Sequence, residues 1–143
     1  RSDAEIGLTF GREVSSGPWR VTTRASIGAQ PLAAISAGNF LGVRSRRGYD
    51  YAAGAIGSAG LNLRHGGVDR LRLEYRGQQL YVLDGVAERH TLHTLHGEGR
   101  VPVRGRMSIG VSGQLLEQRS SFADGTSLSR RLPRYAIFVS LAD

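Results

Sequence analysis

One stretch of the sequence, DRLRLEYRGQQLYVL at residues 69–83, constrains the fold more than any other. From Arg70 to Arg76 charged and apolar residues alternate without a break. Successive side chains of a β-strand leave opposite faces, so this period of two predicts a strand with one charged face and one apolar face. At roughly 3.3 Å per residue, the strand would be far longer than the usual length of about 5–6 residues.

The same alternation recurs along the chain and predicts eight strands. They are expected at residues 4–10, 19–29, 32–42, 49–64, 70–83, 90–101, 107–118 and 131–141. Short joints are expected at 30–31, 65–69 and 102–106, and mostly longer, polar joints at 12–17, 44–48, 84–89 and 119–129. Successive joints of an up-and-down meander fall at opposite ends, which predicts one tight end and one end with longer loops. Both chain ends would then lie at the tight end.

The composition suits one folded domain spanning residues 1–143, either a whole barrel or part of a larger one. The chain has no cysteine, which excludes a disulfide scaffold and thiolate metal sites. All 19 basic residues are arginine, and the net charge of +7 favours anionic partners. The arginines alternate along strands instead of clustering, so no nucleic-acid interface is expected.

Two orientations of such a sheet remain open. A soluble barrel would turn the apolar face inward, where Leu71, Leu73, Tyr75, Ile109 and Val111 could line a cavity for a small apolar ligand. An outer-membrane barrel would turn that face toward lipid and its charges inward. Strand length, the mixed-sign polar faces and the difference between the two ends favour the membrane orientation. No apolar run approaches the roughly 18 residues that a transmembrane helix needs.

In the membrane orientation the polar faces of neighbouring strands would meet inside the barrel. Eight strands enclose a space that side chains can fill, so we expect a closed interior instead of an open pore. The expected interior network consists of Arg70, Arg72, Glu74, Arg76, His96, Glu98 and Arg100. A separate basic loop contains Arg44, Arg46 and Arg47, whose forked donors suit lipopolysaccharide phosphates.

Two chemical motifs stand out in the sequence, and neither predicts a site. In HTLHTLH the spacing of three places His93 on the face opposite His90 and His96, so the three rings cannot converge on a metal. A Ser–His–carboxylate hydrolase acting on lipid could use Ser108 or Ser112 with His96 and Glu98, but no Gly-x-Ser-x-Gly elbow is present. We therefore predict no catalytic, metal or cofactor site, and the lipid hydrolase remains an alternative.

A resemblance to a known protein family rests on three stretches of the sequence: GYDYAAG, LRHGGVDRLRLEYRGQQLYVLDGVAERHTLHTL and RRLPRYAIFVSLAD. Together they resemble the C-terminal part of a family of uncharacterised bacterial outer-membrane β-barrel proteins. The resemblance implies an antiparallel, all-β, up-and-down barrel of about eight strands in the bacterial outer membrane. The expected function is non-enzymatic, either structural or binding through the longer loops, with lipid or lipopolysaccharide as partner.

Overall fold

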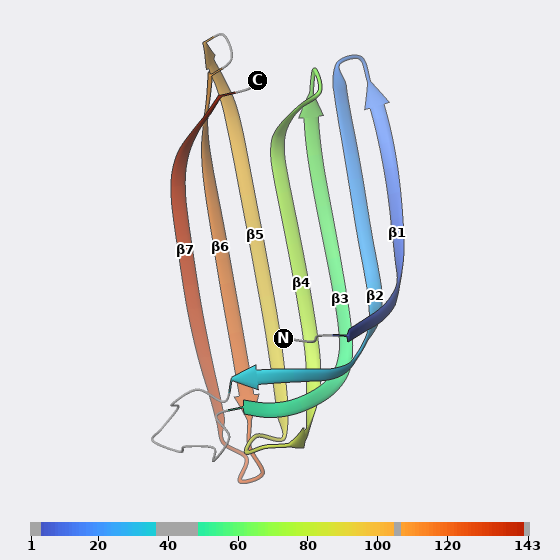
Figure 1. The fold of residues 1–143 in the computed structure, drawn as a ribbon, viewed down its shortest axis with the longest axis vertical. Coiled ribbons are helices and arrows are strands. Elements are labelled where there is room, and N and C mark those ends of the chain that lie inside the picture. Colours follow the sequence, from blue (N-terminus) through green and yellow to red (C-terminus); the bar gives the residue numbers. More distant parts are fainter. Residues whose placement is uncertain (1–3, 37–48, 105–106, 142–143) are drawn as a thin grey trace.

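The structure is a computed structural model that describes residues 4–36, 49–104 and 107–141. These residues form one antiparallel sheet in which seven strands follow each other in sequence order (Figure 1). The strands are β1 (Ala4–Ser16), β2 (Trp19–Ser36), β3 (Tyr49–His65), β4 (Val68–Asp84), β5 (Arg89–Arg104), β6 (Met107–Ser121) and β7 (Ser127–Leu141). The prediction of an all-β, up-and-down antiparallel chain is confirmed. The described residues contain no helix long and apolar enough to cross a membrane.

The predicted turn at Gln30 and Pro31 is wrong, because β2 continues through both residues. The pairing of β2 with β3 shifts in register between Gln30 and Ala33, so the chain bends there without reversing. Pro31 has no N–H to give to the ladder, which suits it to such an irregularity. Residues 32–36 of the predicted third strand therefore belong to β2, and residues 37–42 lie outside the described part. The described sheet has seven strands and is not closed into a barrel.

The two ends of the sheet differ as predicted. The end that we call the turn end carries the connections at residues 17–18 and 66–67, where Gly17, Gly66 and Gly67 adopt φ values of 57°, 57° and 83°. The loop end carries the longer connections at residues 85–88 and 122–126. Two details were wrong: the joint predicted at 12–17 is a tight turn at the turn end, and the first and last strands do not begin and end at the same end of the sheet. With seven strands, β1 begins toward the loop end while β7 ends at the turn end (Figure 1).

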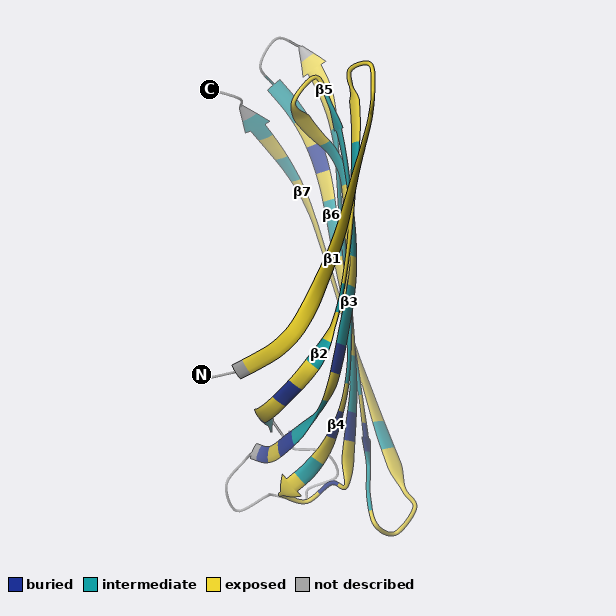
Figure 2. Cartoon of the chain, turned by 90° about the vertical axis from the view of Figure 1, so that its right-hand side faces the viewer, coloured by how far each residue is buried: buried dark blue, intermediate teal, exposed yellow. Residues whose placement is uncertain are grey.

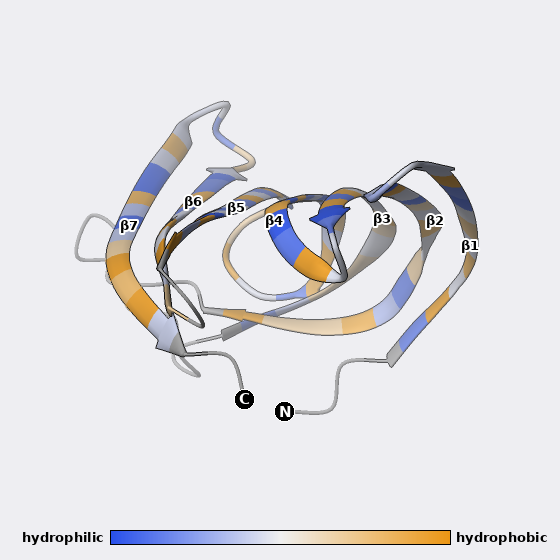
Figure 3. Cartoon of the chain, turned by 90° about the horizontal axis from the view of Figure 1, so that it is seen from above, coloured by the Kyte–Doolittle hydropathy of each residue, from blue (hydrophilic) through white to orange (hydrophobic). Residues whose placement is uncertain are grey.

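The sheet is strongly curved, as the side and end views show (Figures 2 and 3). Arg76 of β4 forms an ion pair with Glu5 of β1, although these strands are not neighbours. Side chains of their shared polar face therefore reach across the hollow, which makes this the concave face. The apolar face is convex, and many large hydrophobic residues on it are exposed. Those on the edge strands include Ile6, Leu8, Phe10, Tyr135, Ile137 and Val139.

The buried residues gather toward the loop end (Figure 2). There the end of β2 and the start of β3 bend across the concave face (Figure 1). A small core forms where Ala33 and Ala52 from these bent segments meet Leu80 of β4. Beside it Gln78 donates a 2.6 Å hydrogen bond to Gln30. The hollow of the sheet is therefore filled at the loop end by the chain's own β2–β3 segments.

The bend of β3 predicts a large difference between two glycines of that strand. A Cβ atom on Gly54 would overlap the backbone of Gln79 and approach Leu80 Cα to 2.9 Å. A Cβ atom on Gly57 would meet only Ser26 O, at 3.6 Å. Since overpacking against a backbone costs about 1–3 kcal/mol, Gly54→Ala should lower the free energy of unfolding by that amount. Gly57→Ala should leave it within about 0.5 kcal/mol of the parent.

Chemical unfolding followed by the fluorescence of Trp19, the only tryptophan, measures both variants. Equal midpoints for Gly54→Ala and Gly57→Ala would show that the close approach of β3 and β4 is not present.

Candidate functional site

A chain of hydrogen-bonded side chains, which we call the clasp, lies buried at the loop end. It consists of Asp50 near the start of β3, His90 near the start of β5 and Ser120 near the end of β6. The antiparallel register places His90 directly opposite Ser120. Asp50 reaches them because the first residues of β3 bend across the hollow. The relative exposures are 1 % for Asp50, 1 % for His90 and 4 % for Ser120.

Each polar atom of the clasp has a partner. His90 Nε2 lies 2.9 Å from Asp50 Oδ2, and His90 Nδ1 lies 2.9 Å from Ser120 Oγ. The backbone N–H groups of Val86 and Ala87 donate to the Asp50 carboxylate over 2.9 and 3.2 Å. An ionised carboxylate only accepts, so Nε2 carries the proton, and Nδ1 of a neutral ring accepts from the Ser120 hydroxyl. Asp50 thus ties the β4–β5 loop to β3, and His90 extends the tie to β6.

The clasp has the residue types of a hydrolytic triad but not its arrangement. In the Ser–His–Asp triad Nδ1 faces the aspartate and Nε2 faces the serine, whereas here Nε2 faces Asp50 and Nδ1 faces Ser120. Ser120 is also almost completely buried, so a substrate could not approach its hydroxyl. The backbone N–H groups nearby are already bonded to Asp50. The clasp is therefore a structural device that fixes the loop end.

Only part of the clasp could be predicted from the sequence. The sequence draws attention to His90 only as part of HTLHTLH, for which it predicts no site. The partners of His90 come from β3 and β6. Ser120 falls in the joint predicted at 119–129, whereas β6 continues to Ser121, and this extension places it opposite His90. Nothing in the local pattern around Asp50 indicates that β3 bends across the sheet.

The predicted interior network lies on the concave face, where several of its members form ion pairs. Arg72 donates to Glu74 Oε1 from Nε at 2.9 Å and from Nη2 at 2.6 Å. Arg100 similarly contacts Glu98 at 2.6 Å, and Arg76 pairs with Glu5. Most of these side chains are about half exposed in the open sheet. They form separate pairs that point into the hollow.

Two predicted members of the network stand apart from these pairs. His96 lies in register between Glu74 and Gln114, and no hydrogen bond joins its ring to another described residue. Arg70 has a buried Nη1 atom without a partner among the described residues. The predicted loop residues Arg44, Arg46 and Arg47 lie outside the described part of the chain.

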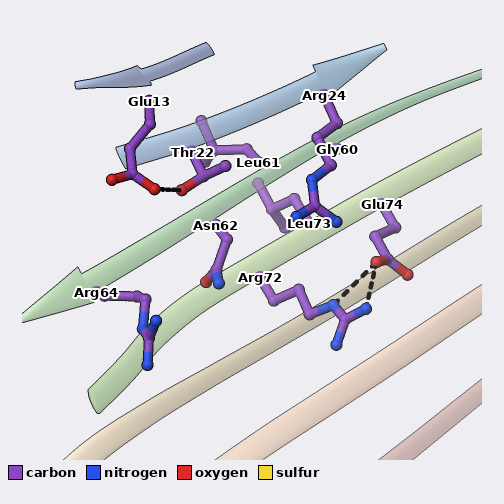
Figure 4. Close-up of a pocket in the computed structure, with 10 residues that line it drawn as sticks. All are labelled: Glu13, Thr22, Arg24, Gly60, Leu61, Asn62, Arg64, Arg72, Leu73 and Glu74. Carbon is purple, nitrogen blue, oxygen red and sulfur yellow. Dashed lines mark hydrogen bonds and ion pairs between the residues drawn. The ribbon is translucent and has the colours of Figure 1, made fainter. Parts of the chain in front are cut away.

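A hollow on the concave face near the turn end shows how charges gather there (Figure 4). Side chains from β1 to β4 line it, including Arg24, Asn62 and Arg64 together with the Arg72–Glu74 pair. Thr22 donates a 3.3 Å hydrogen bond to Glu13 on the same rim. Arginines outnumber carboxylates in this lining, so the hollow has a positive charge balance.

His93 lies on the convex face, as the spacing of three predicts. Its Nδ1 atom is 2.7 Å from the hydroxyl of Tyr75, and the two rings stack. Within residues 4–36, 49–104 and 107–141 no group of three or more His, Asp or Glu side chains is arranged to hold a metal ion. Ser108 and Ser112, the alternative hydrolase serines, lie opposite Pro102 and Glu98 and form no hydrogen bond with His96 in the same part of the chain.

The β6–β7 loop is ordered by its own hydrogen bonds. Thr126 donates to Asp124 Oδ1 from its hydroxyl at 2.6 Å and from its backbone N–H at 2.9 Å. Both bonds stabilise the ionised carboxylate and hold the pKa of Asp124 below its ordinary value, and the bond from the hydroxyl has the larger effect. Gly125 takes a φ of 80° and donates to Phe122 O at 3.0 Å. The loop therefore presents a fixed surface at the loop end.

Comparisons of the chain with protein-family models, curated proteins and solved structures found no match. The family resemblance and its functional implications therefore remain predictions.

The clasp predicts unequal effects of removing its members. Asp50 accepts three hydrogen bonds, so Asp50→Ala leaves two backbone N–H groups and His90 without their acceptor. Each unsatisfied buried group costs about 1–3 kcal/mol, so this variant should lose at least about 3 kcal/mol of unfolding free energy. Ser120→Ala removes one bond and should cost about 1–2 kcal/mol.

Chemical unfolding at neutral pH measures the difference. Glu117→Ala is the matched control, because it removes a carboxylate whose ion pair with Arg131 lies on the surface. Such pairs contribute about 1 kcal/mol or less. If Asp50→Ala cost no more than Glu117→Ala, the clasp would not hold the loop end.

Proposed function

We propose that the chain forms a non-enzymatic β-barrel protein of the bacterial outer membrane, or part of one, that is structural or binds through its longer loops. The observation that carries this proposal is the inverted sheet, whose convex face is apolar and whose concave face is charged. Fully burying a large apolar side chain is worth about 1.5–3 kcal/mol. A convex surface of this kind is stable only in a non-aqueous surrounding, and lipid acyl chains supply one.

The position of the apolar face favours lipid over the soluble alternative. A soluble barrel that binds a small apolar ligand needs an apolar hollow. Leu73, Tyr75, Ile109 and Val111 are instead exposed on the convex side. In the middle of the sheet the hollow is lined largely by polar and charged residues such as Ser26 and Arg76. A ligand in the hollow would meet charges and hydroxyls.

The direction of the edge strands supports closure into a barrel with an even number of strands. Since β1 and β7 are separated by five strands of an antiparallel meander, they run in the same direction. Direct pairing of β1 with β7 would therefore be parallel. Pairing of β7 with β1 of a second copy, rotated about the barrel axis, would also be parallel. An odd number of additional strands makes both new contacts antiparallel. One such strand gives the eight-stranded barrel expected from the sequence.

In the closed barrel the Arg–Glu pairs would fill the interior, and the bent β2–β3 segments would block its loop end. The exposed loops remain for contact with other envelope components. The net charge of +7 suits the phosphates of lipopolysaccharide. We assign Arg44, Arg46 and Arg47 to this contact on sequence grounds, because their forked donors match phosphate oxygens.

Labelling of single cysteines tests the proposal directly, because the chain has no cysteine of its own. Leu73→Cys and Arg72→Cys place a thiol on opposite faces of β4 at adjacent positions. In membranes that contain the protein, a lipid-soluble maleimide should label position 73, while position 72 should be protected inside the barrel. Water-phase labelling at position 72, with position 73 protected, would favour the soluble fold and contradict the proposal.

A further inference from the structure

Each residue of the sheet lies opposite a partner on the next strand, and we call a line of such partners across the seven strands a row. The exposed apolar residues of the convex face do not follow these rows. On β1 the largest exposures belong to Ile6, Leu8 and Phe10, which centre on Leu8. On β7 they belong to Tyr135, Ile137 and Val139, at 84, 80 and 63 %, which centre on Ile137. Val14 lies separately, beyond Arg12. If the apolar surface followed the rows, Leu8 and Ile137 would lie in one row.

The register shows that they do not. The row that begins at Leu8 passes through Ile27, Gly57, Gly77, His93, Glu117 and Arg131. It therefore starts in the middle of the apolar residues of β1 and ends at a charged residue of β7. Ile137 lies six residues closer to the turn end than Arg131, and the row takes six strand-to-strand steps. The apolar surface shifts by about one residue per strand.

The opposite border of the apolar surface shifts in the same direction. The row that begins at Arg12 passes through Thr23, Leu61, Leu73, Gly97, Gly113 and Tyr135. Here the charged residue is on β1, and the most exposed apolar residue is on β7. The apolar residues that these rows cross therefore form a diagonal band with two parallel borders, while Tyr81 and Leu83 of β4, which are also exposed, lie beyond its loop-end border. We call it the diagonal band.

A diagonal band is what a level membrane requires of tilted strands. Residues are about 3.3 Å apart along a strand and strands about 4.8 Å apart, so a shift of one residue per strand corresponds to a tilt of about 35°. Strands of closed barrels tilt by about 35–45°. On β5 the band runs from Leu95 to Val103, with His93 just beyond it. At this tilt those residues span about 22 Å, close to the roughly 25 Å apolar band of outer-membrane barrels.

We propose that the diagonal band is the surface in contact with lipid acyl chains, with both borders level with the bilayer. At the loop-end border His93, Glu117 and Arg131 would face the headgroups, and the clasp and loops would stand outside the hydrocarbon. Their polar groups already have partners there: His93 bonds to Tyr75, and Arg131 pairs with Glu117 at 3.2 Å. This inference rests on the proposed membrane function, and it adds the depth of the protein in the bilayer and the tilt of its strands.

Depth-dependent quenching of single labelled cysteines tests the band. The comparison uses two positions from each row: Leu8→Cys with Glu117→Cys, and Tyr135→Cys with Arg12→Cys. Each cysteine carries a bimane, and the protein is placed in phosphatidylcholine vesicles with a nitroxide on either the acyl chain or the headgroup. We expect positions 8 and 135 to be quenched at least about three-fold more by the acyl-chain label. Positions 117 and 12 should show the reverse preference.

The outcomes separate this inference from the proposed function. If both members of each row show the same depth, the borders follow the rows, and the diagonal band is wrong while membrane insertion stands. If all four positions respond only to aqueous iodide, the convex face is not in lipid, and both the band and the proposed function fail. Two independent rows keep the test valid if one variant does not fold.

Discussion

The two faces of one curved sheet are the constraint on which the rest of this structure depends. Along the strands charged and hydroxyl side chains mostly face the hollow and apolar ones mostly face outward, apart from the core around Leu80 and convex charges such as Arg12 and Glu117. A shift of one residue in any strand pairing would exchange the faces, so the register is strongly specified. Contacts on the concave face support that register: Ser26 and Ser58 lie 2.6 Å apart on neighbouring strands, and across the hollow Arg76 pairs with Glu5 three strands away.

The clasp gives the loop end an order that the ion pairs of the hollow do not provide. Those pairs are largely half exposed, whereas Asp50, His90 and Ser120 are almost completely buried and fully bonded. Together with Leu80, they join segments from β3, β4, β5 and β6. A bent segment fixed in this way blocks one end of the hollow. That arrangement agrees with a closed interior and with loops that keep a defined shape.

Much of the sheet could be predicted from the sequence because alternation is a local property. The stretch from Arg70 to Arg76 specifies its own strand and both of its faces, and the position of His93 follows from the same period. The turn at Gln30–Pro31 was wrong because a proline can mark a bend within a strand as well as a reversal. The partners of His90 could not be predicted, because they depend on how β3 bends across strands distant in sequence.

Polarised infrared spectroscopy of the protein in oriented bilayers tests the central claim most directly, because it reports strand orientation relative to the membrane. A convex lipid-facing surface with a one-residue shift per strand predicts amide I dichroism for strands tilted about 35–45° from the bilayer normal. Protein that remains in the aqueous phase, or amide I bands without dichroism, would contradict the assignment of the convex face to lipid.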